Sequence, residues 1–298
     1  MRACDFERTT NNRNDQIAIM GNLASSFKWK SRFGRFWGLR HRFVMDGACA
    51  RKCVLLYHSI GEGRDSLPLN VFENQMRYLA EHMRVVPLRA LLEEKDSNAG
   101  VTCALTWDDG YESVHTHALP ILRKYGFRAT VYVTTGVIGE RSNRASDEDG
   151  GLTPGLSMLT WPQIRTLQAN GFTVGAHLVH HLDLTKMTGA QALSELQLAR
   201  TSIEKKTGEE CIDFAYPWGR SNRRCAAYVR AAGYRQAVTT VHGPVPTHFD
   251  PMFLPRMNIS REYDMRDFSA ILRGDWDYLA YYQGLKKICR PLTWMMLQ

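Results

Sequence analysis

The feature that most constrains the fold is a regular alternation of short apolar runs with longer amphipathic stretches, which begins near residue 53. Such alternation indicates repeated βα units rather than an antiparallel sandwich. Several runs are apolar throughout, as expected of parallel strands that are covered on both faces. The predicted strands span residues 53–58, 84–88, 102–109, 128–135, 173–177, 213–217, 236–240 and 253–259.

Helices are expected between these strands, and two of them carry clear start signals. Thr160 with Gln163, and Thr188 with Gln191, have the spacing of a capping box. The second pair begins the longest predicted helix, which ends before Gly208, a residue suited to a C-cap. Seven or eight such βα repeats fit either a closed barrel or an open sheet, and periodicity alone does not decide between them.

Composition narrows the class of protein. The 298 residues allow one large core, and contents of 44% hydrophobic and 23% charged residues exclude a wholly disordered, collagenous or polytopic membrane protein. The formal net charge is +8. Because the basic residues form no recognisable nucleic-acid-binding motif, we predict no nucleic-acid partner. The sequence does not indicate the oligomeric state.

Residues 1–52 form an N-terminal extension in which basic and aromatic side chains alternate. One interpretation is an interfacial anchor on anionic lipid, and the other is a mobile or packed extension without that role. No signal peptide is evident, because the apolar run at residues 17–23 is short and broken. The seven cysteines are scattered and form no Cys-x-x-Cys pair, which argues against a disulfide framework and favours the cytoplasm, with peripheral membrane contact through the extension.

Two adjacent carboxylates, Asp108 and Asp109, follow the apolar run at residues 101–105. Burying such a pair is costly unless a cation or protons compensate the charge, which indicates a metal site. The alternative is a helix N-cap, because Asp is favoured there and Gly110 permits a turn.

His177 and His181 follow another predicted strand. If the backbone turns there, both imidazoles converge on one ion, and His is a usual ligand of zinc-like metals. His180 competes with His181, but the four-residue spacing favours His177 with His181. Two histidines and one carboxylate at the carboxyl ends of strands leave coordination positions open for water and substrate.

Two further strand ends carry candidate side chains. Tyr216, Pro217 and Trp218 offer backbone donors and an aromatic wall for a sugar ring, or alternatively a turn packed against the core. His58 lies where barrel enzymes place catalytic side chains, although a lone histidine at a strand end is more often structural.

At several places the sequence resembles the polysaccharide deacetylase family, also called the NodB-homology domain or carbohydrate esterase family 4. TWDDG at residues 106–110 is similar to its T-F-D-D-G motif, HLVHH at 177–181 to its H-[S/T]-x-x-H motif, and AYPWG at 215–219 to its R-x-P-Y motif. The opening VLLYHSI at 54–60 is similar to members that act on bacterial poly-N-acetylglucosamine. The resemblance spans roughly residues 53–260.

The resemblance implies a distorted (β/α) barrel of seven or eight parallel strands. It also implies metal-dependent hydrolysis of the N-acetyl group of an N-acetylated amino-sugar polysaccharide or oligosaccharide. In the implied roles Asp109, His177 and His181 bind a divalent metal, for which Zn²⁺ is the default. Asp108 is then the general base and His58 the general acid, and a backbone N–H near Trp218 shares the charge of the oxyanion.

The sequence departs from the family pattern in its third motif and beyond. Leu178 replaces a Ser or Thr of the metal loop, and Ala215 replaces the arginine that orients the base. Arg256 is the predicted substitute partner of Asp108, with a rim salt bridge as the alternative. The late histidine motif is matched only loosely at residues 241–242, so His242 is a reserve acid.

These departures leave two alternatives open: a carbohydrate-binding relative without turnover, and a deacetylase of a lipid-linked or small amide substrate. We expect three parts in the chain. These are the extension at 1–52, the deacetylase domain at 53–260 and a helical extension at 261–298 that packs on the barrel.

Overall fold

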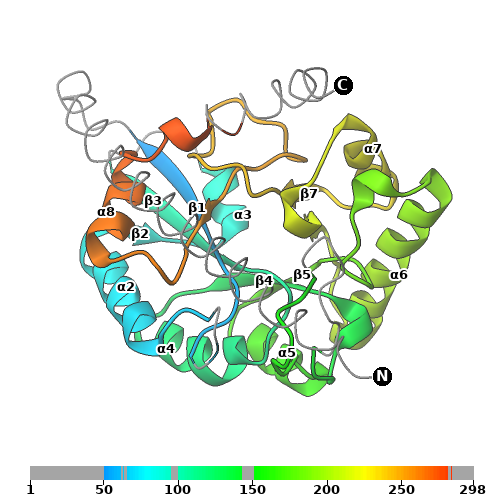
Figure 1. Cartoon of the computed structure of the whole chain (residues 1–298), viewed down its shortest axis with the longest axis horizontal. Helices are drawn as coiled ribbons and strands as arrows, with labels where there is room; N and C mark the ends of the chain where they lie inside the picture. Colours follow the sequence, from blue (N-terminus) through cyan, green and yellow to red (C-terminus); the bar gives the residue numbers. More distant parts are fainter. Residues whose placement is uncertain are drawn as a thin grey trace, which may run out of the picture.

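The computed structural model describes residues 50–61, 63, 66–94, 100–142, 151–280 and 283. Helices and strands alternate along the chain (Figure 1). The strands are β1 (Arg51–Tyr57), β2 (Arg84–Val85), β3 (Val101–Trp107), β4 (Ala129–Val133), β5 (Thr173–Ala176), β6 (Asp213–Ala215), β7 (Gln236–Val238) and β8 (Met257–Asn258). The α-helices are α2 (Leu69–His82), α3 (Leu88–Glu93), α4 (Leu119–Lys124), α5 (Trp161–Ala169), α6 (Gly189–Thr207), α7 (Arg223–Ala231) and α8 (Met265–Arg273). The short helical turns are η1 (Val114–Ala118), η2 (Thr135–Val137), η3 (Leu184–Lys186) and η4 (Pro217–Gly219).

The strands form one parallel sheet in the order β7-β6-β5-β4-β3-β1-β8, with β2 paired to β3. β3 pairs with β1 along its whole length, from Val101 to Trp107. On its other side β3 pairs first with β2 and then, near its carboxyl end, with β4. The strands that carry the predicted metal ligands, β3 and β5, are therefore separated only by β4.

The two edges of the sheet are joined through Leu254. Its amide donates to the carbonyl of Ala237 (3.0 Å), and its carbonyl accepts from the amide of Thr239 (2.8 Å). A few residues further on, β8 pairs with β1. The sheet thus curls into a distorted barrel with helices around its outside (Figure 1), and the alternative of an open sheet is wrong.

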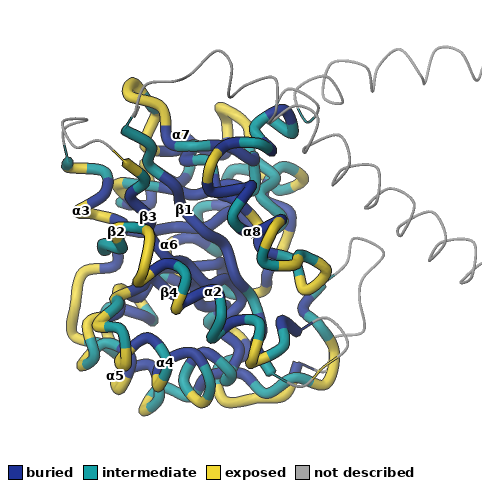
Figure 2. Tube along the Cα trace, turned by 90° about the vertical axis from the view of Figure 1, so that its left-hand side faces the viewer, coloured by how far each residue is buried: buried dark blue, intermediate teal, exposed yellow. Residues whose placement is uncertain are grey.

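Both faces of the strands are buried, which explains why their sequences do not alternate between polar and apolar residues. Val54 and Ala104 join Leu254 in a cluster that draws on five strands and fills the inside of the barrel. Cys53 and Leu55 point the other way and pack in the layer beneath the helices. Figure 2 shows the strands as a buried centre with the exposed residues at the periphery.

Both predicted capping boxes are present. The Thr160 hydroxyl accepts from the amide of Gln163, whose side chain accepts from the amide of Thr160 (2.8 Å), and Thr188 with Gln191 repeats the arrangement. α6 ends at Gly208, whose φ of 75° is the left-handed conformation that glycine adopts at no steric cost.

Two predicted strands are reduced to two residues each, and each predicted span contains a proline. Residues 84–88 contribute only β2, because Pro87 is the N-cap of α3. Residues 253–259 contribute only β8, because Pro255 has no amide hydrogen to donate to a neighbouring strand.

The structure describes part of the C-terminal extension but almost none of the N-terminal one. Residues 1–49 of the N-terminal extension lie outside the described residues. In the C-terminal extension, α8 packs on α2 with the rings of Tyr78 and Phe268 edge to face at 6.0 Å, and Asp277 pairs with Arg51 at 2.6 Å. Across the described ranges, no helix combines the length and apolarity needed to span a membrane.

Candidate metal and catalytic centre

The candidate side chains follow the carboxyl ends of parallel strands. Asp108 and Asp109 follow β3, His177 follows β5, Trp218 follows β6 and His58 follows β1. Because parallel strands of a barrel end at the same rim, these residues gather on one side of the molecule.

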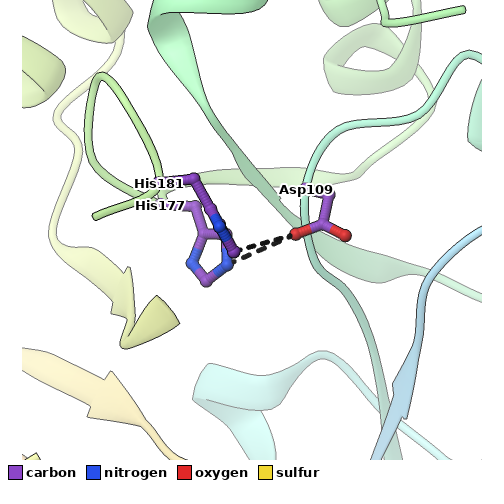
Figure 3. Close-up of side chains that lie close together, drawn as sticks. All are labelled: Asp109, His177 and His181. Carbon is purple, nitrogen blue, oxygen red and sulfur yellow. Dashed lines mark ion pairs between the residues drawn. The ribbon is translucent and has the colours of Figure 1, made fainter. Parts of the chain in front are cut away.

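Asp109, His177 and His181 form a compact group in which the two imidazoles point at the carboxylate (Figure 3). The Nε2 atoms of His177 and His181 lie 3.4 Å and 3.5 Å from Oδ1 of Asp109. The three ligand atoms all lie within 4.8 Å of one another, and the side chains are 10% exposed or less.

The spacing fits a shared metal ion better than direct hydrogen bonds. Two ligands that each bind a tetrahedral zinc ion at about 2.0–2.1 Å lie about 3.3 Å apart. A charge-assisted N–H···O bond would instead be about 2.7–2.9 Å long. The observed distances of 3.4 Å and 3.5 Å are close to the first value.

The histidines are oriented by different means. Nδ1 of His177 lies 2.8 Å from the carbonyl oxygen of Ala215 and donates to it, so the nitrogen that loses its proton in the neutral ring is Nε2, which faces Asp109. The ring of His181 packs against that of Trp218, with centroids 4.4 Å apart. Nδ1 of His181 is buried, and within the described part of the chain it has no hydrogen-bond partner.

Backbone strain is concentrated at this rim. Among the described residues, the non-glycine residues with positive φ are Asp109 (72°), Leu178 (64°), His181 (51°) and Trp218 (54°). Such conformations cost roughly 1–3 kcal/mol each and persist only where the surroundings impose them. Sequence patterns do not reveal this strain, because none of the four is a glycine.

Asp108 is held by Arg256, as the sequence predicted. The guanidinium donates Nη1–H to Oδ1 (2.7 Å) and Nη2–H to Oδ2 (2.6 Å), and its Nε donates to the carbonyl of Thr239 (2.8 Å). Arg256 is fully buried, so the alternative of a solvated rim salt bridge is wrong. Burial alone would raise the pKa of Asp108, but the Arg256 charge and hydrogen bonds outweigh it and lower that pKa.

Electrostatics separate the protonation states of the two histidines. Burial, and then the charge of His177, lowers the pKa of His181 to about 4, so that ring is neutral near pH 7. Burial would also lower the pKa of His177, but Asp109 and Asp108 outweigh it and raise that pKa. Burial alone would raise the pKa of Asp109, but the neighbouring imidazoles outweigh it and hold that pKa well below the usual range.

His58 lies within electrostatic range of both carboxylates. Its charge contributes to lowering the pKa of Asp108 and of Asp109. The carbonyl of the preceding residue, Tyr57, accepts from the amide of Asp108 (3.1 Å), which ties the end of β1 to the end of β3. The role of His58 as general acid stays a prediction.

Trp218 is anchored by two residues to which sequence reasoning gave no role. The guanidinium of Arg220 lies over the indole, 5.1 Å from the ring centroid, and pairs with Asp183 at 2.8 Å. The spacing of Arg220, two residues after Trp218, is a weak signal that would not have been decisive.

Two predicted site residues lie elsewhere. The side chain of Tyr216 is fully buried in the core, stacked on Phe253 at 6.3 Å, so it forms no substrate wall. His242 is also buried, and the charges that act on it belong to Asp277 and Arg51 at the start of β1, the opposite end from His58. After β7 the chain runs to the start of β1, where the amide of Val245 donates to the carbonyl of Lys52 (2.9 Å). His242 therefore lies away from the rim, which contradicts its assignment as reserve acid.

Two hollows are lined by residues that follow the same strands as the centre. One, of about 640 Å³, lies beyond β5 and β6 and is lined by Trp218 and Leu182 among others. The second, of about 780 Å³, lies beyond β1 and β3 and is lined by Ser59 and Tyr111 among others. Trp218 packs against His181 and Ser59 follows His58, so each hollow has a lining residue next to the centre.

Comparisons with known proteins agree with this arrangement. A family model described as polysaccharide deacetylase matches residues 95–237. YxkH of Bacillus subtilis, a protein named for the same family, is 27% identical over 230 residues, which are 76% of this chain and 77% of that protein. A poly-beta-1,6-N-acetyl-D-glucosamine N-deacetylase of Staphylococcus aureus is 23% identical over 207 residues, which are 65% of this chain and 68% of that protein.

Solved structures show the same fold. The Streptococcus pyogenes deacetylase PplD has a TM-score of 0.63 at 22% identity, covering 75% of this chain and 99% of its own. IcaB of Ammonifex degensii has a TM-score of 0.64 at 21% identity, covering 76% and 97%. The architecture is thus the NodB-type deacetylase barrel. The family-model match and these relatives support a polysaccharide deacetylase, a hydrolase that acts on amide bonds.

Proposed function

We propose that the protein removes the N-acetyl group from N-acetylglucosamine units of a polysaccharide or oligosaccharide in a metal-dependent reaction. The observation that carries the proposal is the position of a fixed, ionised carboxylate, Asp108, directly beside the ligand group Asp109, His177 and His181. The likeness to a poly-N-acetylglucosamine deacetylase supports the choice of sugar.

The donor set of one carboxylate and two imidazoles favours Zn²⁺. A divalent ion bound there supplies Lewis-acid polarisation of the acetamide carbonyl and lowers the pKa of a water molecule. His177 holds its Nε2 lone pair toward that position because Ala215 binds its other nitrogen.

Asp108 is suited to act as the general base. Its lowered pKa keeps it ionised near pH 7, and the bidentate contact with Arg256 fixes the plane of the carboxylate. Each carboxylate oxygen retains a lone pair beyond the one that Arg256 occupies, so Asp108 can accept the proton of the attacking water.

His58 completes the proton balance. As water adds to the carbonyl carbon and the C–N bond breaks, His58 donates a proton to the amine nitrogen that leaves. The products are acetate and a free amino sugar. Trp218, which flanks His181, offers an aromatic surface for the sugar ring.

Acetate release from N-acetylglucosamine oligomers tests the proposal. Zinc-loaded wild type should release acetate, and Asp108→Asn should bind zinc but release none above background. Asp250→Asn, which alters an exposed carboxylate, is the control and should retain activity. Zinc and glycan binding by the wild type without release from any acceptor would replace the proposal with the carbohydrate-binding alternative.

We also propose a cytoplasmic location with peripheral membrane contact through residues 1–52. The scattered cysteines and the basic aromatic composition of that extension support it. Co-sedimentation with anionic vesicles, compared between the full chain and a variant with its extension arginines and lysines changed to glutamine, would test the contact.

A further inference from the structure

A carboxylate on α6, far in sequence from the motifs, contacts the turn that carries both histidines. Oε2 of Glu195 accepts from the amides of Val179 and His180, each at 3.1 Å. Oε1 of Glu195 lies 2.6 Å from Nδ1 of His180. The Glu195 side chain is 13% exposed, whereas that of His180 is 45% exposed.

The conformation of this turn requires such a partner. Leu178 and His181 both adopt positive φ, which non-glycine residues avoid. Two successive amides that point to one side make a concave site for an anion, and Glu195 supplies the anion. On the other side, the carbonyls of Leu178 and Val179 accept from the amides of Thr135 (3.1 Å) and Gly136 (2.8 Å).

His181 depends on this turn more than His177 does. The ring of His177 is oriented by the carbonyl of Ala215 at 2.8 Å. For His181 no hydrogen bond to Nδ1 exists within the described ranges, so the backbone of the turn and the contact with Trp218 place its ring. Leu178 has no hydroxyl that could brace the turn from within.

We infer that Glu195 is a positioning residue that fixes the turn at residues 177–181 and thereby the metal affinity of the centre. The inference deepens the proposed function and rests on it for the identity of the ligand. Glu195 itself touches neither the predicted metal position nor the reacting atoms.

Zinc affinity, measured by competition with a chromophoric chelator, tests the inference. Glu195→Ala should weaken zinc binding about 10- to 100-fold, the usual effect of losing a residue that orients a ligand. Glu195→Gln should remain close to wild type, because its amide oxygen can still accept from Val179 and His180. Rescue by Gln would separate a specific hydrogen-bonding role from a general loss of packing.

Glu204→Ala is the matched control. Glu204 lies on the same helix, pairs with Arg200 at 2.9 Å and accepts from the amide of Cys211 at 3.1 Å, but it contacts no residue of the centre. Its loss should leave zinc affinity unchanged. Equal affinities of wild type and Glu195→Ala, or an equal loss in Glu204→Ala, would overturn the inference. Glu195→Asp, too short to reach both amides, should show the same weakening and serves if the alanine variant does not fold.

Amide hydrogen exchange of the metal-free protein provides a readout that does not depend on zinc. Glu195→Ala should lose protection at Val179 and His180, whereas Glu204→Ala should not. If the wild type binds no zinc, the proposed function fails, and exchange still decides the matter for Glu195. Unchanged protection at both amides in Glu195→Ala would contradict the inference.

Discussion

At the scale of single residues, Arg256 and Asp108 form a bidentate ion pair in the candidate centre. Both side chains are buried, at 0% and 4% exposure. Removing one partner of such a pair leaves an uncompensated charge in the interior, which is far more damaging than losing an exposed pair. The same contact is what keeps Asp108 ionised for its proposed role.

Arg256→Met should therefore destabilise the protein by about 3–5 kcal/mol and raise the pKa of Asp108. The comparison is Arg230→Met, whose pair with Asp250 is about half exposed and should contribute only about 0–1 kcal/mol. Urea unfolding at pH 7 measures both. Similar losses in the two variants would contradict the assignment of Arg256 as a buried, specific partner.

His242 makes a second prediction at this scale, concerning pH. Burial lowers its pKa to about 4, from an unfolded value of about 6.5. The unfolded state thus binds more protons between these values, so stability is fully present above about pH 6.5 and is lost as the pH falls toward 4. The loss from this group should reach about 3 kcal/mol.

Between pH 7 and pH 4, the unfolding free energy of His242→Gln should fall by about 3 kcal/mol less than that of the wild type. The other histidines are present in both proteins and cancel in the comparison. A variant as acid-sensitive as wild type would show that His242 is protonated in the folded state.

At the scale of elements, α6 links helix capping to the centre. Its start is fixed by Thr188 and Gln191, and Glu195 follows a turn later. The strained turn at residues 177–181 therefore relies on a helix whose own first turn is secured by local hydrogen bonds.

Thr188→Ala should lower the unfolding free energy by about 1 kcal/mol, because the amide of Gln191 loses its acceptor. Thr201→Ala, an exposed position within α6, should be neutral or slightly stabilising by helix propensity. Urea midpoints of the two variants make the comparison. An unchanged midpoint for Thr188→Ala would mean that the capping box contributes nothing in this context.

At the scale of the whole molecule, the metal-ligand group joins segments that follow β3 and β5. Only the folded state brings these ligands together, so an ion that binds them adds its binding free energy to the stability of the fold.

Zinc at one hundred times its dissociation constant should stabilise the wild type by about 2.7 kcal/mol, seen as a rise in melting temperature that chelation reverses. His181→Gln should abolish the rise. His248→Gln, at an exposed position, should retain it. A rise that survives in His181→Gln would place the stabilising ion elsewhere.

The sequence by itself determined the features that depend on neighbouring residues. Apolar runs indicated each strand, and the pairs Thr160–Gln163 and Thr188–Gln191 with Gly208 fixed helix ends, because caps are made between residues close in the chain. The order of motifs after predicted strands also placed Asp109, His177 and His181 at one rim, since parallel strands end together.

Only the tertiary structure decided what depends on the path of the chain through space. Closure of the barrel through Leu254, the burial of Tyr216 in the core and the removal of His242 to the far end of β1 leave no local signal. Arg256 was the predicted partner of Asp108, 148 positions away, but only the structure chose this contact over a rim salt bridge. Glu195 contacts the histidine turn from a helix whose sequence pattern gives no sign of that role. Local hydrogen bonds and burial can be predicted from short stretches of sequence. Contacts across a core depend on how the whole chain packs.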